Sequence, residues 1–179
     1  MKNFKFKSAL VILVTALSMS ATAEDRHNFT SNALGNILGL FNLEYSYKVL
    51  SQATLGITAY TGDATIDNYK LDGNSFGLVS RIYAKPAFEE SAWFLIAAVD
   101  KKDFDISRTE NGIKYAGKSD DVVGSIGVGY HWFWDSFNVS LGALATSQKK
   151  IELTDSSGNR YGDRMDAKLS FDFTVGGKF

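Results

Sequence analysis

The chain has 179 residues, of which 45% are hydrophobic, 13% aromatic and 22% charged, with one proline and no cysteine. This composition is typical of a folded domain and excludes a disordered or collagen-like chain, and the absence of cysteine excludes disulfides and thiolate zinc sites. The formal net charge is -1, and its distribution along the chain is uneven.

Residues 1–23 have the three parts of a secretory signal peptide. Three lysines and no acid precede the apolar stretch 9–17, which is followed by Ala21-Thr22-Ala23. A membrane anchor is the less favoured alternative, because a helix needs about 20 apolar residues to cross a bilayer. Cleavage after Ala23 would leave residues 24–179 as a mildly acidic domain, which argues against nucleic acid as a partner. No later segment is long and apolar enough for a helical span, so any membrane span must be built from strands.

After the leader, apolar and polar residues alternate with a period of two, which predicts β-strands. Segment 92–99 is continuously apolar, but its length and flanks also fit a strand. Residues 27–36 alternate poorly and are included as the first strand because a closed single-chain bacterial barrel has an even strand count. The sequence therefore predicts an all-β fold, an eight-stranded antiparallel up-and-down transmembrane β-barrel, with the other strands near 41–47, 53–59, 76–84, 92–99, 122–134, 137–146 and 169–179.

The predicted connections are of two kinds that alternate along the chain. Residues 48–51, 85–91 and 135–136 are short, whereas 61–72, 103–120 and 152–165 are long, polar and contain glycine. Asn111-Gly112 and Gly158-Asn159 are turn formers near the tips of two long connections. If the short turns are periplasmic, the long connections project outside the cell. Their lysines and arginines could then meet lipopolysaccharide phosphates or another surface.

The alternation leaves open whether the apolar face points inward, as in a secreted soluble β-barrel binding protein, or outward into lipid. The polar faces are mostly Gly, Ser, Thr and Asn, and their few charges are Glu44, Arg81, Asp172 and Lys178. A lysine or arginine facing lipid at the bilayer midplane costs about 2–4 kcal/mol, and no apolar-face position is charged. We therefore expect the apolar face outside, with Glu44, Arg81 and Asp172 in an interior network. A narrow gated channel lined by these residues is an alternative.

Aromatic residues gather beside the short connections, as in the interfacial girdles of membrane barrels. The chain also ends in a strand whose last residue is Phe179. With this final strand, Leu169 to Phe179, the sequence resembles the small outer-membrane β-barrel proteins of Gram-negative bacteria, such as the OmpX-like and OmpA-transmembrane-domain-like families. The resemblance implies a location in the cell outer membrane, lipids and lipopolysaccharide as partners, and a final strand read by the barrel-assembly machinery. The expected girdle comprises Tyr45, Tyr47, Tyr83, Phe88, Trp93, Phe94, Tyr130, Trp132, Trp134, Phe137 and Phe179.

The residues offer little for catalysis, and no catalytic, cofactor or metal site is predicted. The two histidines are His27, near the processed end, and His131, on an inward-facing position. A lipid A deacylase-like site needs a serine two residues after its histidine, whereas residue 133 is phenylalanine. Acidic residues Asp63, Asp67 and Asp72 could meet a calcium ion, but solvated loop acids are the expected case. We expect a non-enzymatic envelope protein, structural or adhesive through its loops, with a lipid A-modifying enzyme as the alternative.

Overall fold

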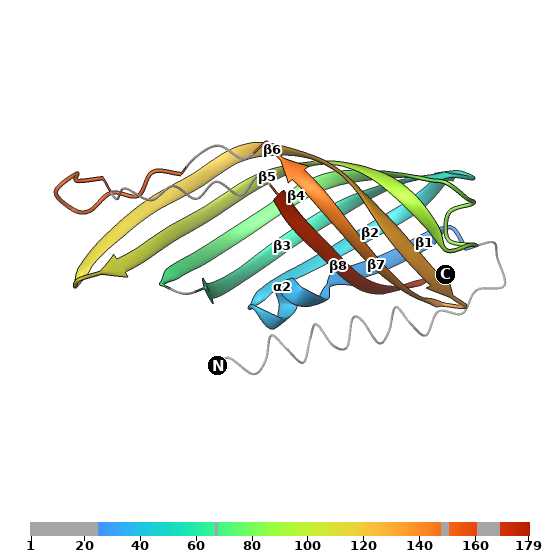
Figure 1. Cartoon of the computed structure of the whole chain (residues 1–179), viewed down its shortest axis with the longest axis horizontal. Coiled ribbons are helices and arrows are strands. Elements are labelled where there is room, and N and C mark those ends of the chain that lie inside the picture. The colour runs from blue at the N-terminus through green and yellow to red at the C-terminus, as the bar shows by residue number, and fades with distance from the viewer. Residues whose placement is uncertain (1–24, 67, 148–150, 161–168) are drawn as a thin grey trace.

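The computed structural model describes residues 25–66, 68–147, 151–160 and 169–179, so the predicted signal peptide lies outside the described residues. Eight antiparallel strands form one closed barrel in which each strand pairs with its chain neighbour and β1 pairs with β8 (Figure 1). The predicted fold class is confirmed. Among the described residues, no helix has the length and apolar character needed to cross a membrane. The strands are β1 (His27–Asn32), β2 (Leu40–Leu50), β3 (Ala53–Ile66), β4 (Tyr69–Tyr83), β5 (Ala92–Glu110), β6 (Ile113–Trp134), β7 (Phe137–Thr146) and β8 (Leu169–Lys178).

The first strand is shorter than predicted. It ends at Asn32, and the chain continues as the five-residue helix α2 (Ala33–Ile37). The Asn32 side chain accepts a hydrogen bond from the Gly35 backbone N–H at 2.7 Å, which is the N-cap geometry that begins a helix. Gly39, at φ +89°, then turns the chain into β2. The poor alternation after Asn32 therefore reflects a change from strand to helix.

Two of the three predicted long connections are wrong, because residues 61–72 and 103–120 are mostly extensions of strands. β5 has 19 residues and β6 has 22, about twice the 9–11 that cross a bilayer, and they stay paired up to Glu110 and Ile113. Asn111 and Gly112 close this hairpin with φ values of 49° and 78°, which confirms the predicted turn. Backbone hydrogen bonds hold such a ladder whatever the side chains are. Beyond the apolar wall, the apolar residues of β5, such as Phe104 and Ile106, lie on the other face of the sheet, so the outward alternation does not mark the extension.

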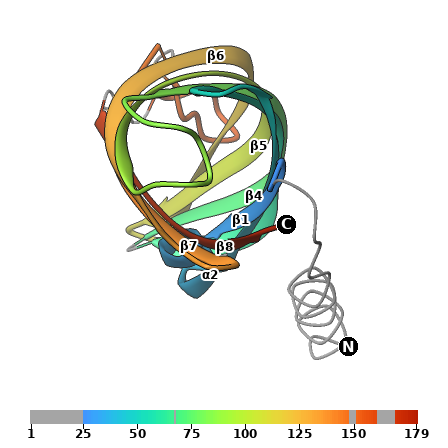
Figure 2. The same cartoon turned by 90° about the vertical axis from the view of Figure 1, so that its right-hand side faces the viewer.

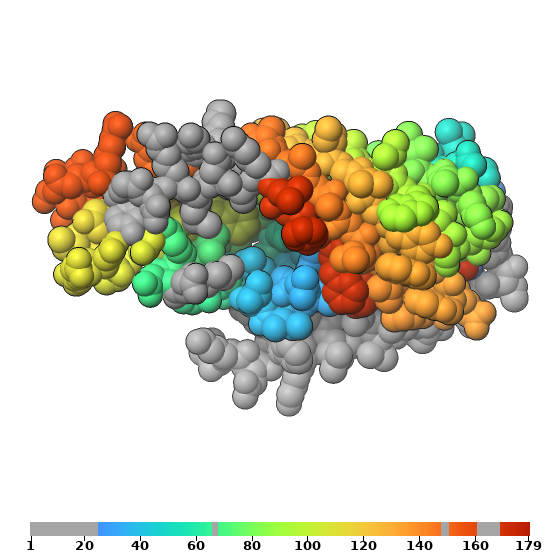
Figure 3. Space-filling view, viewed as in Figure 1, coloured from blue at the N-terminus to red at the C-terminus, as the bar shows by residue number. Residues whose placement is uncertain are grey.

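The extended parts of β3–β6 form a protrusion beyond the rest of the barrel. We define the protrusion as residues 63–66, 68–73, 101–121 and 151–160; it lies at the left of Figures 1 and 3, and the short connections lie at the other end. Thr154 pairs with Ala116 on β6 through backbone hydrogen bonds of 2.8 and 2.9 Å. The protrusion has its own small apolar core, made of Ile106, Ile151 and Leu153 with the half-buried Tyr69, Leu71, Phe104 and Tyr115.

The apolar face of the barrel points outward, as predicted. Along β2, polar side chains such as Asn42 and Ser46 are buried inside, while Phe41, which precedes Asn42, is exposed. The same alternation continues around the barrel, so that large apolar side chains cover the outer wall. Those more than 45% exposed on the outer wall include Leu55, Ile57, Phe76, Leu78, Ile82, Leu95, Val99, Val122, Ile126, Leu141, Leu169 and Phe171.

Candidate functional site: the barrel interior

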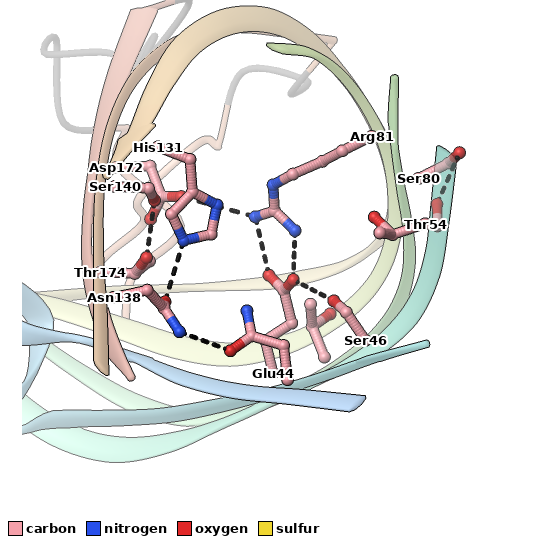
Figure 4. Close-up of polar contacts among 12 residues, drawn as sticks. Glu44, Ser46, Thr54, Ser80, Arg81, His131, Asn138, Ser140, Asp172 and Thr174 are labelled. Atoms are coloured by element: carbon pink, nitrogen blue, oxygen red, sulfur yellow. Dashed lines mark hydrogen bonds and ion pairs between the residues drawn. The ribbon is translucent and has the colours of Figure 1, made fainter. Parts of the chain in front are cut away.

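An ion pair between β2 and β4 lies at the centre of the interior. Both terminal nitrogens of Arg81 bind the two carboxylate oxygens of Glu44, with Nη2 and Oε2 2.9 Å apart (Figure 4). The side chains are 4% and 9% exposed, so the pair is screened little by water. Ser46 Oγ donates to Glu44 Oε1 at 2.6 Å. A bidentate guanidinium–carboxylate contact fixes orientation as well as charge.

The third predicted member of the network comes from the opposite side of the barrel. Asp172 on β8 has its Oδ2 4.0 Å from Arg81 Nη2, and Asn32 Nδ2 donates to its other oxygen at 2.8 Å. The structure therefore brings Glu44, Arg81 and Asp172 together across the lumen, as predicted. Arg81 pairs closely with Glu44, which meets the requirement that buried charges be paired, while Asp172 has the hydrogen bond from Asn32 and the longer contact with Arg81.

A second set of hydrogen bonds centres on His131 of β6. Its Nδ1 lies 3.2 Å from Tyr83 Oη, and its Nε2 lies 2.9 Å from Asn138 Oδ1. Asn138 Nδ2 in turn donates to Asn28 Oδ1 at 2.7 Å. His131 is 2% exposed, and both of its ring nitrogens hydrogen-bond to wall residues. These bonds link β4, β6, β7 and β1 across the barrel, and Figure 4 shows the contact between His131 and Asn138.

The connection between β4 and β5, residues 84–91, lies across the mouth of the barrel at the short-turn end (Figure 2). Phe88 points inward and is 0% exposed, although its φ of 69° is unfavourable for a non-glycine residue. Several contacts hold this segment, which we call the plug. Lys178 Nζ donates to the Phe88 carbonyl at 2.6 Å, the Lys48 ammonium pairs with Glu89 at 2.6 Å, and the Ala87 N–H donates to a carbonyl of the β2–β3 turn at 2.7 Å.

The plug closes an apolar layer inside the barrel, and this corrects part of the predicted aromatic girdle. Tyr83, Phe88 and Phe94 do not face outward but are 3%, 0% and 2% exposed, inside the wall. The ring centroids of Phe88 and Phe133 are 5.9 Å apart, and those of Tyr83 and Phe94 are 5.7 Å apart. Next to the plug, β5 carries apolar side chains on both its inner and its outer face, so segment 92–99 shows no alternation of apolar and polar residues. Trp93 and Trp134 do lie on the outer wall, where they are 61% and 53% exposed.

The remaining residues considered for catalysis or metal binding lie in separate parts of the structure. His27 begins β1, where its ring stacks on Phe179 with centroids 5.4 Å apart. His131 is followed two residues later by Phe133, whose ring stacks on it at 4.1 Å. Asp63 and Asp72 are cross-strand partners on the protrusion, and Asp67 lies outside the described residues. In the part of the chain that the structure describes, no three His, Asp or Glu side chains are grouped to hold a metal ion.

The outer face of the protrusion carries paired charges. Lys101 binds Asp120, and Lys118 Nζ lies 3.0 Å from Asp103 Oδ1. The Lys101 ammonium holds the pKa of Asp120 below its usual range, and Asp103 raises the pKa of Lys118. Both pairs are more than half exposed, so they are screened by salt and add little stability.

No protein-family model and no curated protein matches this sequence.

Proposed function

We propose that this protein is an integral outer-membrane protein of the OmpX-like kind, a non-enzymatic transmembrane barrel with a structural or surface-interaction role. The observation that carries this proposal is the inverted distribution of side chains. A soluble barrel would bury its apolar face and expose charge, whereas this barrel exposes Leu78, Leu95 and Ile126 and buries Glu44 with Arg81. Water is a poor solvent for such a wall, and a bilayer is a good one.

The height of the apolar wall supports a bilayer as its surroundings. On β6 the outward positions from Val122 to Trp134 carry apolar or small side chains, with Tyr and Trp rings at the short-turn end. The outward residue that precedes Val122 is Asp120, where the apolar wall ends. Twelve residue steps along a strand tilted by about 45° rise about 28 Å, close to the hydrocarbon thickness of about 30 Å. On β5 the same change occurs between Val99 and Lys101. The protrusion begins where the apolar wall ends.

The filled interior favours a structural role over conduction. An eight-stranded barrel has a lumen just wide enough for its own side chains. Here the Glu44–Arg81 pair crosses the lumen, and the buried Phe88 lies at the mouth. His131 lies near the plug with both nitrogens bonded, which favours packing over catalysis.

The proposal includes partners at each end. The protrusion, with its mixed charges, would be the part available to lipopolysaccharide or another surface. The final strand, which ends in Phe179, would be read by the barrel-assembly machinery. The Phe179 ring stacks on Phe29 at 5.8 Å, so the last residue belongs to the seam where β8 meets β1.

The proposal is tested by an epitope inserted at each end of the barrel. One variant carries the epitope between Asn111 and Gly112, and the matched control carries it between Asp135 and Ser136, since both are two-residue hairpin turns that tolerate insertion. We expect both proteins in the outer-membrane fraction, with mobility in SDS gels that changes on boiling. Antibody should label intact cells of the first variant, and the control only after permeabilisation. Recovery of the wild-type protein in the soluble fraction would refute the proposal, and the reverse labelling would refute the orientation.

A further inference from the structure

The wall of the barrel has a break between the first residues of β2 and the first residues of β8, which no strand fills among the described residues. β1 is six residues long, and its pairing ends at Thr30 toward β2 and at Asn32 toward β8. β2 and β8 extend further, to Leu40 and Leu169, where they still pair with β3 and β7. The short helix α2 lies beside this break, and Figure 3 shows the surface hollowed between the blue atoms of α2 and the red atoms of β8.

Side-chain hydrogen bonds, in place of a strand, attach α2 to the edge of β2. Asn36 Nδ2 donates to Ser31 Oγ at 2.8 Å, and Asn36 Oδ1 accepts from the Asn42 backbone N–H at 3.4 Å. Ser31 Oγ donates in turn to the Asn42 carbonyl, so both backbone groups of Asn42 are bonded by side chains, as a wall in lipid requires. Toward β8, the side-chain bond among the described residues is the one from Asn32 to Asp172. The boundary between α2 and β8 is therefore the weakly held side of the break.

The carboxylate of Asp172 lies at the inner end of this boundary. It is two residues beyond Thr174, the last residue of β8 that pairs with β1, and like Thr174 it faces the lumen. Its Oδ1 accepts from Asn32, whereas its Oδ2 is 4.0 Å from Arg81, which is outside hydrogen-bond distance. The side chain is 16% exposed, compared with 4% for Arg81. Among the described residues nothing donates to Oδ2, which can accept a further hydrogen bond.

The charges around Asp172 favour a cation as that donor. Glu44, Arg81 and Asp172 together carry one excess negative charge when ionised, because Arg81 neutralises Glu44 through both of its terminal nitrogens. Arg81 is the nearest cation to Asp172 among the described residues. A buried carboxylate is costly without a close cation, and an ammonium group supplies both the charge and three donors.

The outer side of the break is apolar. Phe41 on β2 and Phe171 on β8 each precede the inward polar residue of their strand, and both are exposed on the outer wall. α2 has no buried residue, and its large apolar side chains are also exposed. A molecule that reached Asp172 through the break would therefore keep a hydrocarbon chain in apolar surroundings.

Resting on the proposed function, in which this wall faces lipid, we propose that the break between α2 and β8 is a lateral binding site for an ammonium group carried by a membrane-dissolved amphiphile. The ammonium donates to Asp172 Oδ2 while Asn32 stays on Oδ1, and the hydrocarbon chain leaves the barrel beside Phe171. A soluble amine has the same head chemistry but would have to enter through the mouth of the barrel, so the test separates these two sources.

The test is NMR of the nitrogen-15-labelled protein in nanodiscs of phosphatidylcholine, whose head group has no N–H donor, titrated with dodecylammonium. We expect saturable shifts of the backbone amide resonances of Asn32 and residues 171–173. Asp172→Asn keeps an oxygen for Asn32, removes the charge and leaves the Glu44–Arg81 pair intact. Its apparent affinity should fall about tenfold, which corresponds to about 1.4 kcal/mol. The matched control Asp63→Asn, which changes an exposed carboxylate of the protrusion, should bind as the wild type does.

Each other outcome overturns the inference. Equal shifts with uncharged dodecanol would show that the apolar chain alone binds, and this comparison on the wild type decides even where Asp172→Asn does not fold. Equal affinity of Asp172→Asn would show that its charge is not recognised, and equally tight binding of butylammonium would identify a soluble amine as the ligand. A wild type that changes gel mobility on boiling and fractionates with the outer membrane, yet shows no saturable shift, contradicts this inference and leaves the proposed function standing.

Discussion

Replacing Arg81 with methionine is the most informative perturbation of the interior. Methionine keeps most of the apolar stem of the side chain and removes its charge and donors. Glu44 would retain Ser46 as a partner and lose both guanidinium contacts, and Asp172 would lose its nearest cation. Removing one partner of a buried pair costs about 3–5 kcal/mol, because the other charge stays buried without compensation. We expect Arg81→Met to lower the free energy of unfolding by about that amount.

The assay is urea-induced unfolding of the refolded protein in lipid vesicles, followed by tryptophan fluorescence and gel mobility. The control is Lys70→Met, because Lys70 pairs with Asp63 at 3.2 Å but both side chains are more than half exposed, and such a pair contributes about 0–1 kcal/mol. The double variant Glu44→Gln, Arg81→Met should be more stable than the sum of the single effects by about 1–3 kcal/mol. Additive effects, or an Arg81→Met cost no larger than that of the control, would refute the reasoning.

Three further predictions concern the plug, the barrel seam and the protrusion. Phe88→Ala should cost about 3–5 kcal/mol in the same unfolding assay, because it empties the fully buried position that closes the apolar layer; a cost below about 1 kcal/mol would mean that the plug is not packed as described. Gly176→Ala should sharply lower the folded fraction seen on gels, because a Cβ atom there would lie 2.0 Å from a β1 carbonyl oxygen, whereas Gly142→Ala should fold normally, since its nearest contact is 3.4 Å. If both variants fold equally well, the close approach of β8 to β1 is wrong. Hydrogen bonds from the Asn159 side chain and backbone hold the pKa of Asp155 below its usual range. Because the pKa of Asp155 is lowered in the folded state, its ionised carboxylate stabilises the turn at pH values above the ordinary aspartate pKa of about 3.9. The turn loses this stabilisation as the pH falls through the lowered pKa. Carbon-13 NMR titration should show the pKa rising toward its ordinary value in Asn159→Ala; an unchanged pKa would contradict the contact.

Most of the strands that cross the apolar wall could be predicted from sequence, because apart from β5 they have one mainly polar face toward the interior and one apolar face toward the outside. Glu44 and Arg81 could be assigned to the interior by the same alternation, which places both on the polar face. Their pairing required the shared lumen of a narrow barrel, and it followed from the scarcity of other charges on that face. The outward orientation of the apolar face could be predicted because the polar face has few lysines and glutamates, whereas a face exposed to water would be rich in them.

Three features could not be predicted from alternation. On β5 the apolar side chains change faces at the protrusion: the apolar wall ends at Val99, and the apolar residues beyond it, Phe104 and Ile106, lie on the other face, so the outward alternation does not mark this part of the strand. The apolar layer behind Phe94 makes both faces of β5 apolar, which hides the period for the opposite reason. The plug is an irregular connection whose position depends on contacts with distant residues such as Lys48 and Lys178. The sequence contains one indication of the plug, because Phe88 is a large aromatic residue within a short connection.

The orientation of the wall is tested most directly by spin labels at single cysteines, which the natural chain lacks. Labels would be placed at Leu78 and Leu95 on the outer wall and at Asp105 on the protrusion, in protein reconstituted into vesicles. Labels at Leu78 and Leu95 should collide freely with oxygen dissolved in lipid and rarely with a water-soluble nickel reagent, and the label at Asp105 should show the reverse. Equal access of the nickel reagent to all three positions would contradict a barrel whose outer wall faces lipid.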